Sequence, residues 1–407
     1  INNGKMLRNF VQILRSGKVG RKSLGSAPKK LVENWLANRS DNQLFEDSVG
    51  NDPSIADIIK MVHPKPSSDS RKHFYAYLIG REYSEKNLPK IVREFEEFKR
   101  NKEVIPDVPF QMLTSLDLTK ENWIEIFKNA NWHMTRMNLN TAARHGVIED
   151  KVMVTLIANR LRDETIIRKV GVFPYQLYAA YVNTGDDVPV KIKNALQDAA
   201  EIAIENVPAI EGKVYVCVDT SGSMKSAITG NRIGATSKVN CVDVAGLIAA
   251  SILRKNEEAS IVPFDTSVHE VSFNPRDSVI TNAKKFALNG GGTDCACALR
   301  YLNAEKAKGD VVIFVSDNES WYTPEGVRQS LRGTAMATEW KVFRKRNPKA
   351  KLVCIDLTAN KTTQVAEANE VMNCGSFSDT VFELISMFVQ NKLTPQHWVG
   401  LIEKVTL

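Results

Sequence analysis

Residues 214–224 read VYVCVDTSGSM, an apolar run that stops at Asp219 and continues into a turn with hydroxyls at Ser221 and Ser223. Short, β-branched apolar runs of this kind predict a strand that is buried on both faces. The turn presents one carboxylate and two hydroxyls from a single segment. Hard oxygen ligands suit Mg²⁺, Mn²⁺ or Ca²⁺ better than zinc. The stretch therefore predicts both a buried strand and a candidate cation site.

Three further apolar runs follow, at residues 259–265, 310–317 and 349–357, with helical periodicity in the segments between and after them. This alternation predicts an α/β domain with a mostly parallel, doubly wound sheet that is covered on both faces. Residues 268–273, VHEVSF, are predicted to form a short antiparallel edge strand.

Three of the four predicted strands end in an aspartate, at Asp219, Asp265 and Asp317. Ligands of open α/β sheets bind outside the carboxyl ends of the strands. The glycine-rich stretch NGGGTDC, residues 289–295, exposes a further hydroxyl. Three loops thus supply two carboxylates and three hydroxyls, and we predict a divalent cation site, most favourably for Mg²⁺, made by Asp219, Ser221, Ser223, Thr293 and Asp317. The alternative is that the hydroxyls cap helix N-termini.

Residues 1 to about 205 place apolar residues three and four apart between frequent Gly and Pro breaks, and they contain no good strand pattern. This predicts an antiparallel helical array of the HEAT or armadillo kind, although no fixed sequence period supports it. We therefore predict three parts: a helical-repeat domain at 1–205, the α/β domain at 206–392 and a C-terminal tail at 393–407.

The formal net charge of +7 arises in the first 200 residues, whereas the rest of the chain is balanced. No acidic residue precedes Glu33, although that segment is rich in Lys and Arg. Such a distribution is typical of a surface that binds phosphate groups, and the alternative is a solvated helix face. The best candidates for RNA contacts, which we call the basic stripe, are Lys18, Arg21, Lys22, Lys29 and Lys30.

The bulk sequence argues against membrane insertion and export. No apolar stretch reaches the roughly 18 to 20 residues of a membrane span, and no leader pattern opens the chain. The six cysteines include no CxxC pair, and no His flanks them at zinc spacing. They predict reduced core residues of a cytoplasmic protein, with a metal or redox site at Cys295 and Cys297 as the alternative.

The DxSxS turn with its distal Thr and Asp resembles the metal-ion-dependent adhesion site (MIDAS) of von Willebrand factor A domains, and all five positions are present. In that family the hydroxyls bind the cation directly, and the carboxylates act largely through bound water. The cation then accepts a carboxylate from a partner protein. The resemblance therefore implies a cation site that binds a partner protein and does not catalyse a reaction.

Several other stretches resemble the Ro autoantigen family, in particular its bacterial members. They are GGTDC, SDNES with Trp321, NCGSFSDTVFELI, SGKVGRKSLGSAPKKLVENWL, IKMVHPKPSS and RMNLNTAARHGV. The resemblance implies a helical TROVE module that closes into a ring with the von Willebrand A domain. It further implies binding of misfolded noncoding RNA ends in the hole of the ring and of Y RNAs outside it. A partnership with an exoribonuclease such as polynucleotide phosphorylase in RNA maturation and decay is also implied.

The resemblance adds two groups of candidate RNA-binding residues. His63 and Lys65 match the family's H-x-K-P stretch, although the basic pair that accompanies this His in vertebrate members is absent. Arg136, Arg144 and His145 lie in the RMNLNTAARHGV segment, where the last two could equally cap a helix C-terminus. We expect a monomer that binds RNA without DNA specificity.

Catalysis finds little support. A phosphatase DxD loop would need an Asp in place of Ser221, and a two-metal nuclease would use more carboxylates than this site offers. No His is suitably placed to activate a cysteine, because His269 lies on the predicted edge strand. We expect no enzyme, and the alternatives to RNA binding are an adhesion-type protein-binding module and a metal-dependent phosphohydrolase.

Overall fold

The computed structural model describes all residues of 1–407 except 21, 229–237, 289, 318–334, 359–362, 364, 376–380, 394–398, 401–402 and 404–407. The chain divides into two compact units. Unit 1 comprises residues 1–134 and 145–147, and unit 2 comprises residues 135–144 and 148–407. The predicted domain boundary at 205 stays a prediction.

Unit 1 is helical. Its elements are α1 (Gly4–Arg15), α2 (Ser26–Asn38), α3 (Asp41–Asp47), α4 (Ile55–Val62), α5 (Asp69–Ile79), η1 (Glu85–Asn87), α6 (Lys90–Asn101), α7 (Phe110–Leu113) and α8 (Lys120–Asn129), and α9 (Trp132–Met137) spans the division between the units. Three of these helices begin with reciprocal capping boxes, in which Ser40, Ser54 and Thr119 satisfy backbone N–H groups of the first turn. The phenyl ring of Phe45 meets those of Phe74 and Phe95 edge-on, with centroids 6.1 and 5.5 Å apart, and so joins α3, α5 and α6.

A buried arginine connects α5 to the end of α2. The guanidinium of Arg71 donates to the carbonyl oxygens of Leu36 at 3.1 Å and Arg39 at 2.7 Å. It also forms an ion pair with Asp41 at 2.9 Å. The last carbonyls of a helix lack partners inside that helix, so this side chain both caps α2 and fixes the turn into α3.

Unit 2 combines helices with a sheet. The helices before the sheet are α10 (Leu139–Arg144), η2 (Val147–Glu149), which spans the division between the units, α11 (Lys151–Leu161), α12 (Glu164–Val170), α13 (Pro174–Asn183), α14 (Val190–Ala203) and η3 (Ile204–Asn206). They pack against the α/β part that follows. The Tyr178 hydroxyl lies 3.1 Å from a carboxylate oxygen of Asp243, and Arg254 forms an ion pair with Glu201.

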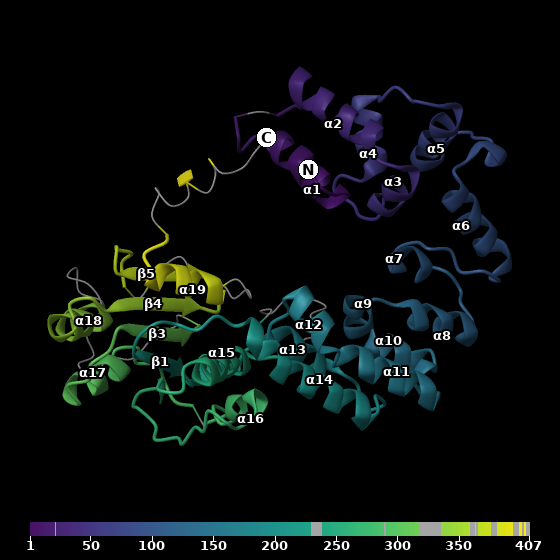
Figure 1. Ribbon diagram of the computed structural model, residues 1–407. Helices are drawn as coiled ribbons and strands as arrows, with labels where there is room; N and C mark the ends of the chain where they lie inside the picture. Colours follow the sequence, from purple (N-terminus) through teal and green to yellow (C-terminus); the bar gives the residue numbers. More distant parts are fainter. Residues whose placement is uncertain are drawn as a thin grey trace. The chain divides into compact units, whose positions relative to one another are not determined.

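The sheet has five parallel strands in the order β2-β1-β3-β4-β5. Figure 1 labels β1, β3, β4 and β5, which follow one another in this order. The strands are β1 (Val214–Asp219), β2 (Ser260–Phe264), β3 (Val311–Ser316), β4 (Lys351–Asp356) and β5 (Val371–Gly375). The other elements are η4 (Gly222–Lys225), α15 (Cys241–Lys255), α16 (Val279–Lys284), α17 (Cys297–Ala304), α18 (Ala335–Arg346) and α19 (Val381–Val389). Helices α17 and α18 cover one face, where Phe314 and Trp340 share a core, and α15 packs against β1, β2 and β3. The predicted fold class is confirmed.

Two details of the sheet differ from the prediction. The expected edge strand at 268–273 is wrong, because this segment makes an isolated antiparallel bridge between Val268 and Phe264 and then leaves the sheet. The edges of the sheet are formed by β2 and β5, and the sequence VMNCG of β5 was not recognised as a strand. Its second half is only partly buried, so the continuous apolar run of the other strands is missing there.

All six cysteines are free, and five of them are buried. Burial, together with the negative charge of Asp294, raises the pKa of Cys297 to about 12, so its thiol stays protonated and apolar in character. The prediction of core cysteines is confirmed for the five buried residues, whereas Cys374 is only partly buried, and the reduced state stays a prediction. Among the described residues, no helix combines the length and the hydropathy that crossing a bilayer would take.

Replacing Arg71 by Ala should loosen the end of α2, because two helix carbonyls and Asp41 lose their buried partner. We expect the free energy of amide exchange in α2 to fall by roughly 2–4 kcal/mol in hydrogen-exchange mass spectrometry. The control is Lys72→Ala, at an exposed site on α5 next to Arg71, which should change the free energy of amide exchange in α2 by less than about 0.5 kcal/mol. Equal protection of α2 in both variants would contradict the proposed role of Arg71.

Candidate functional site

The predicted cation site lies at the carboxyl edge of the sheet. Strands β1 and β3 pair in parallel with Val218 opposite Val315, so Asp219 at the end of β1 and Asp317 just after β3 come to the same edge. Both aspartates are buried, with exposed fractions of 0% and 3%. Burial of two neighbouring carboxylates is unfavourable unless hydrogen bonds or cations compensate their charge.

The DTSGS turn is held by its own carboxylate. One oxygen of Asp219 accepts the backbone N–H of Ser221 at 2.8 Å, and the other accepts the hydroxyl of Ser316 at 2.7 Å. The hydroxyl oxygens of Ser221 and Ser223 lie 3.1 Å apart. Ser221 occupies the N-cap position of η4 but makes no side-chain capping bond. Its hydroxyl therefore faces its neighbour in the turn, which weakens the helix-capping alternative.

The glycine-rich loop packs closely on this turn. The N–H of Gly222 donates to the carbonyl of Gly291 at 3.0 Å. Gly290 has a φ of +49°, and a Cβ there would come within 2.7 Å of the Thr220 carbonyl oxygen. Only glycine allows this approach. Thr293 follows in the same loop and is 3% exposed, which places the third predicted hydroxyl in the buried part of this edge.

Negative charge accumulates at this edge. Burial raises the pKa of Asp219 to about 6, and the charge of Asp317 contributes to the shift. Burial and the same Asp317 charge raise the pKa of Asp356, at the end of β4, to about 6. Asp356 was not among the predicted site residues, although KLVCID repeats the apolar run and terminal Asp of VYVCVD. That repeat was the signal that could have found it.

The residues at this edge fit a divalent cation. Within the described residues, no group of three or more His, Cys, Asp or Glu side chains forms a metal cluster, so a cation here would depend on hydroxyl ligands. Ser221, Ser223 and Thr293 supply hydroxyls, and Asp219 and Asp317 supply buried negative charge. Such an all-oxygen set suits a hard cation and excludes a zinc site built from thiolates or imidazoles.

Asp265, the third strand-terminal aspartate, supports the loops of the site. One of its oxygens accepts the N–H of Gly291 at 3.0 Å, and the other lies 3.1 Å from Nε2 of His269. Burial raises the pKa of Asp265, but hydrogen bonds from Ser267 and Gly291 and the neighbouring His269 outweigh burial and lower it overall. Asp265 is thus a positioning group for the glycine-rich loop.

The basic stripe lies on the connection between α1 and α2 and on the first turns of α2. Lys18, Lys22 and Lys30 are exposed, and Lys29 is half-buried at 3.9 Å from Glu33. Arg21, the remaining member, lies outside the described residues. The described members thus present their charge to solvent.

His63 and Lys65 are exposed on the connection between α4 and α5. His63 ends α4 in a left-handed conformation with a φ of +52°. The end of α1 lies beside the end of α4, because the guanidinium of Arg15 is 3.2 Å from the sulfur of Met61. Figure 1 shows α1, α2 and α4 as neighbours in unit 1. The connection that carries Lys18 and Lys22 therefore starts beside the end of α4, where His63 lies.

The last three predicted RNA-binding residues have different surroundings. Arg136 donates from Nη1 to the carbonyl of Gln176 at 2.9 Å, and the His145 ring stacks on Trp123 with centroids 4.2 Å apart. Arg144 is exposed in the last turn of α10. Arg136 and Arg144 belong to unit 2, whereas the basic stripe belongs to unit 1. Internal contacts occupy Arg136 and His145, as expected of residues with a structural role.

The fold and the candidate site define a helical protein with a von Willebrand A type α/β part. Comparisons with known proteins agree with this class. Residues 213–389 match the family model described as the Ro60 vWA domain. The chain is also similar to the crystal structure of the Ro protein of Deinococcus radiodurans, with a TM-score of 0.71, 18% identity, and coverage of 96% of this chain and 81% of that one.

Two curated relatives are similar in sequence, and both are named RNA-binding protein RO60. The relative from Deinococcus radiodurans is 25% identical over 197 residues, 45% of this chain and 36% of the relative. The relative from Caenorhabditis elegans is 27% identical over 222 residues, 51% of this chain and 33% of the relative. The chain thus spans about a third of the length of these relatives. Together the comparisons show that the chain is similar to Ro proteins, in agreement with the resemblance found in its sequence.

Replacing Asp356 by Asn should stabilise unit 2 when divalent cations are chelated. The pKa of Asp356 in the folded protein, about 6, exceeds the ordinary value of 3.8, so ionisation of this carboxylate destabilises the folded state. This destabilisation is absent below pH 3.8, grows between pH 3.8 and 6, and is complete above pH 6. In EDTA at pH 7.5 we expect a gain of roughly 1–2 kcal/mol, seen as a melting temperature a few degrees higher. The gain should shrink at pH 5.

The control is Asp186→Asn, which removes the same charge from an exposed loop and should leave the melting temperature unchanged. A melting temperature of Asp356→Asn at or below that of the wild type at pH 7.5 would show that the carboxylate is compensated where it lies.

Proposed function

We propose that the chain is a non-catalytic RNA-binding protein of the Ro kind. Its ligands are structured or misfolded noncoding RNAs, including Y-like RNAs, and its role is RNA quality control, maturation or decay in the cytoplasm. We further propose that it acts as a monomer and as an adaptor for an exoribonuclease such as polynucleotide phosphorylase. The observation that carries the proposal is the exposed basic stripe in a chain whose curated relatives are named RNA-binding proteins.

The electrostatics of unit 1 support phosphate binding. Of the described members of the basic stripe, Lys29 forms an ion pair with Glu33, whereas Lys18, Lys22 and Lys30 show no ion pair among the described residues. Free exposed lysines keep their charge available for a polyanion. Phosphate contacts of this type fix the position of a nucleic acid and carry no sequence information, so shape and unpaired segments must supply selectivity.

The carboxyl edge of the sheet has a separate role in this proposal. Asp219, Ser221, Ser223, Thr293 and Asp317 would hold one divalent cation, most favourably Mg²⁺, with Mn²⁺ or Ca²⁺ as alternatives. Such a cation supplies a positive charge to which an acidic side chain of a partner protein binds. The motif supplies only two carboxylates, Asp219 and Asp317, and no position for a second cation, which argues against phosphodiester hydrolysis by two metal ions.

A second candidate function is that of an adhesion-type module, in which the cation site binds a protein partner and RNA has no specific role. The cation motif favours it, because Asp219, Ser221, Ser223, Thr293 and Asp317 all lie within the α/β part. The two candidates differ in what the basic stripe does.

RNA binding should depend steeply on salt. In filter binding to a structured RNA with a single-stranded 3′ tail, Lys18→Ala with Lys22→Ala should weaken binding at low salt and less so at high salt. The slope of log affinity against log salt should become shallower by about 1.5, because each lost phosphate contact removes roughly 0.7–0.9.

The control pair is Lys86→Ala with Lys90→Ala, exposed lysines of η1 and α6, which should retain the wild-type slope. A flat slope for the wild type would reject the RNA proposal and leave the protein-binding module. An equal loss at every salt concentration in the stripe variant would mean that these lysines do not contact phosphates.

A further inference from the structure

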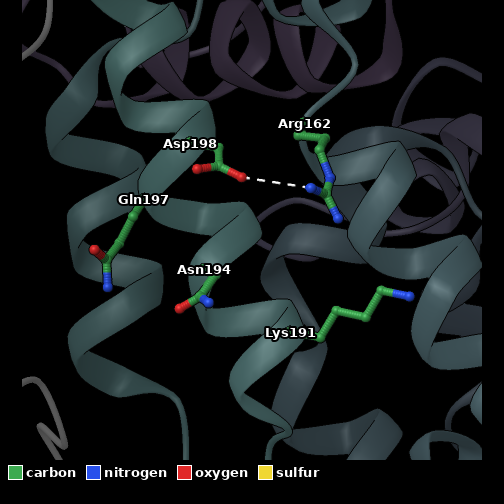
Figure 2. Close-up of a pocket in the computed structure, with 5 residues that line it drawn as sticks. All are labelled: Arg162, Lys191, Asn194, Gln197 and Asp198. Carbon is green, nitrogen blue, oxygen red and sulfur yellow. Dashed lines mark ion pairs between the residues drawn. The ribbon is translucent and has the colours of Figure 1, made fainter.

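Unit 2 contains a polar cavity that belongs neither to the cation site nor to the basic stripe. It has a volume of about 450 Å³ and is lined by Arg162, Lys191, Asn194, Gln197 and Asp198 (Figure 2). Four of these residues lie on α14, and Arg162 reaches toward them from the C-terminal end of α11. Every lining side chain can make hydrogen bonds, so the cavity favours a ligand that is polar over its whole length.

The helix spacing orders these groups along one direction. Lys191, Asn194 and Asp198 are three and four residues apart and so lie on one side of α14. The first and last are separated by about two helical turns, roughly 10 Å. Lys191 provides a cation at one end, with its ammonium 2.8 Å from the Thr155 hydroxyl. The other end holds the Arg162 and Asp198 pair, which the dashed line in Figure 2 marks.

The Arg162 and Asp198 pair is loose. Its closest N–O distance is 3.5 Å, and the two side chains are 39% and 54% exposed. A charge-assisted hydrogen bond is normally about 2.7–2.9 Å long. Each group therefore keeps hydrogen-bonding capacity for a ligand: the guanidinium offers donors, and the adjacent carboxylate offers two acceptor oxygens.

This order of donors and acceptors matches one nucleobase best. The Watson–Crick edge of guanine presents the O6 acceptor beside the N1–H and N2–H donors, so O6 can face Arg162 while both donors face Asp198. Adenine and cytosine each offer the carboxylate one amino group beside an unprotonated ring nitrogen, and uracil offers it one N–H. Asn194 and Gln197 carry both donors and acceptors, and Lys191 suits the phosphate at the far end.

We infer that this cavity binds one unpaired guanine nucleotide of an RNA strand, with Asp198 and Arg162 at the base edge and Lys191 at the phosphate. The inference rests on the proposed RNA-binding function and adds a base preference to it. A pocket that is open to solvent, as the exposed Lys191, Asn194 and Asp198 show, can read an unpaired base by its Watson–Crick edge, which a duplex would hide. The basic stripe of unit 1 offers no comparable acceptor, because its members are Lys and Arg.

The test compares fluorescein-labelled nine-nucleotide RNAs that differ in the central base: uridine tracts with a central guanosine, inosine or adenosine. Fluorescence anisotropy with the full chain should give an affinity for guanosine about fivefold above that for adenosine, at the lower end of what a bidentate base contact provides. Inosine lacks the N2 amino group and should fall between them. GMP should compete only at far higher concentration than the oligonucleotide.

The decisive variant is Asp198→Asn, which keeps the size of the side chain but replaces one acceptor by a donor. It should remove the preference for guanosine while the affinity for adenosine stays within about twofold. Lys191→Ala should weaken all three RNAs alike and reduce the salt slope by about 0.7. Asp186→Asn is the matched control for charge, and it should retain the preference. Thermal melting of each variant checks that it folds.

The outcomes separate this inference from the proposed function. Equal affinity for the three RNAs with a steep salt slope would overturn the guanine pocket and leave RNA binding intact. Binding of none of them at low salt would overturn both. A guanosine preference that survives Asp198→Asn would place the selectivity elsewhere, and displacement by GMP at the concentration of the oligonucleotide would overturn the assignment to an RNA strand.

Discussion

The parallel register of the sheet is the constraint on which the candidate site depends. It brings the ends of β1, β3 and β4 to one edge, and each of these ends carries an aspartate, Asp219, Asp317 or Asp356. All three are buried, and the pKa values of Asp219 and Asp356 rise to about 6 by burial and by the charge of Asp317. An edge built in this way stores an electrostatic cost, which a bound divalent cation would relieve.

The basic stripe depends on solvated charge, whereas the sheet edge depends on burial. The basic stripe lies on exposed helix ends of unit 1, where lysines remain solvated and act through long-range charge. Buried oxygen ligands require fixed geometry, which the tight turn at Ser221 and the close approach of Gly290 provide. The two sites should therefore respond to different changes. Phosphate binding by the lysines should depend on ionic strength, and cation binding at the sheet edge should depend on packing.

Local patterns in the sequence predicted the four apolar strands, the helical first half and the DxSxS turn, because each depends on residues close in the chain. The long-range contacts were not predictable. Tyr178 contacts Asp243, 65 residues away in the sequence, and Arg162 contacts Asp198, 36 residues away. Helical periodicity does not predict either pair. Asp356 was detectable in principle, whereas β5 was not, because its residues 373–375 are only partly buried or exposed and lack an apolar run.

The most direct test of the account is calorimetric titration of Mg²⁺ into protein freed of divalent cations. We predict that the wild type and Ser272→Ala, which alters an exposed serine outside the site, each bind one Mg²⁺ per chain. Ser221→Ala should bind none while it keeps the wild-type circular dichroism spectrum. Absence of binding by the wild type to Mg²⁺, Mn²⁺ and Ca²⁺ alike, or unchanged binding by Ser221→Ala, would contradict the claim that this sheet edge holds a cation.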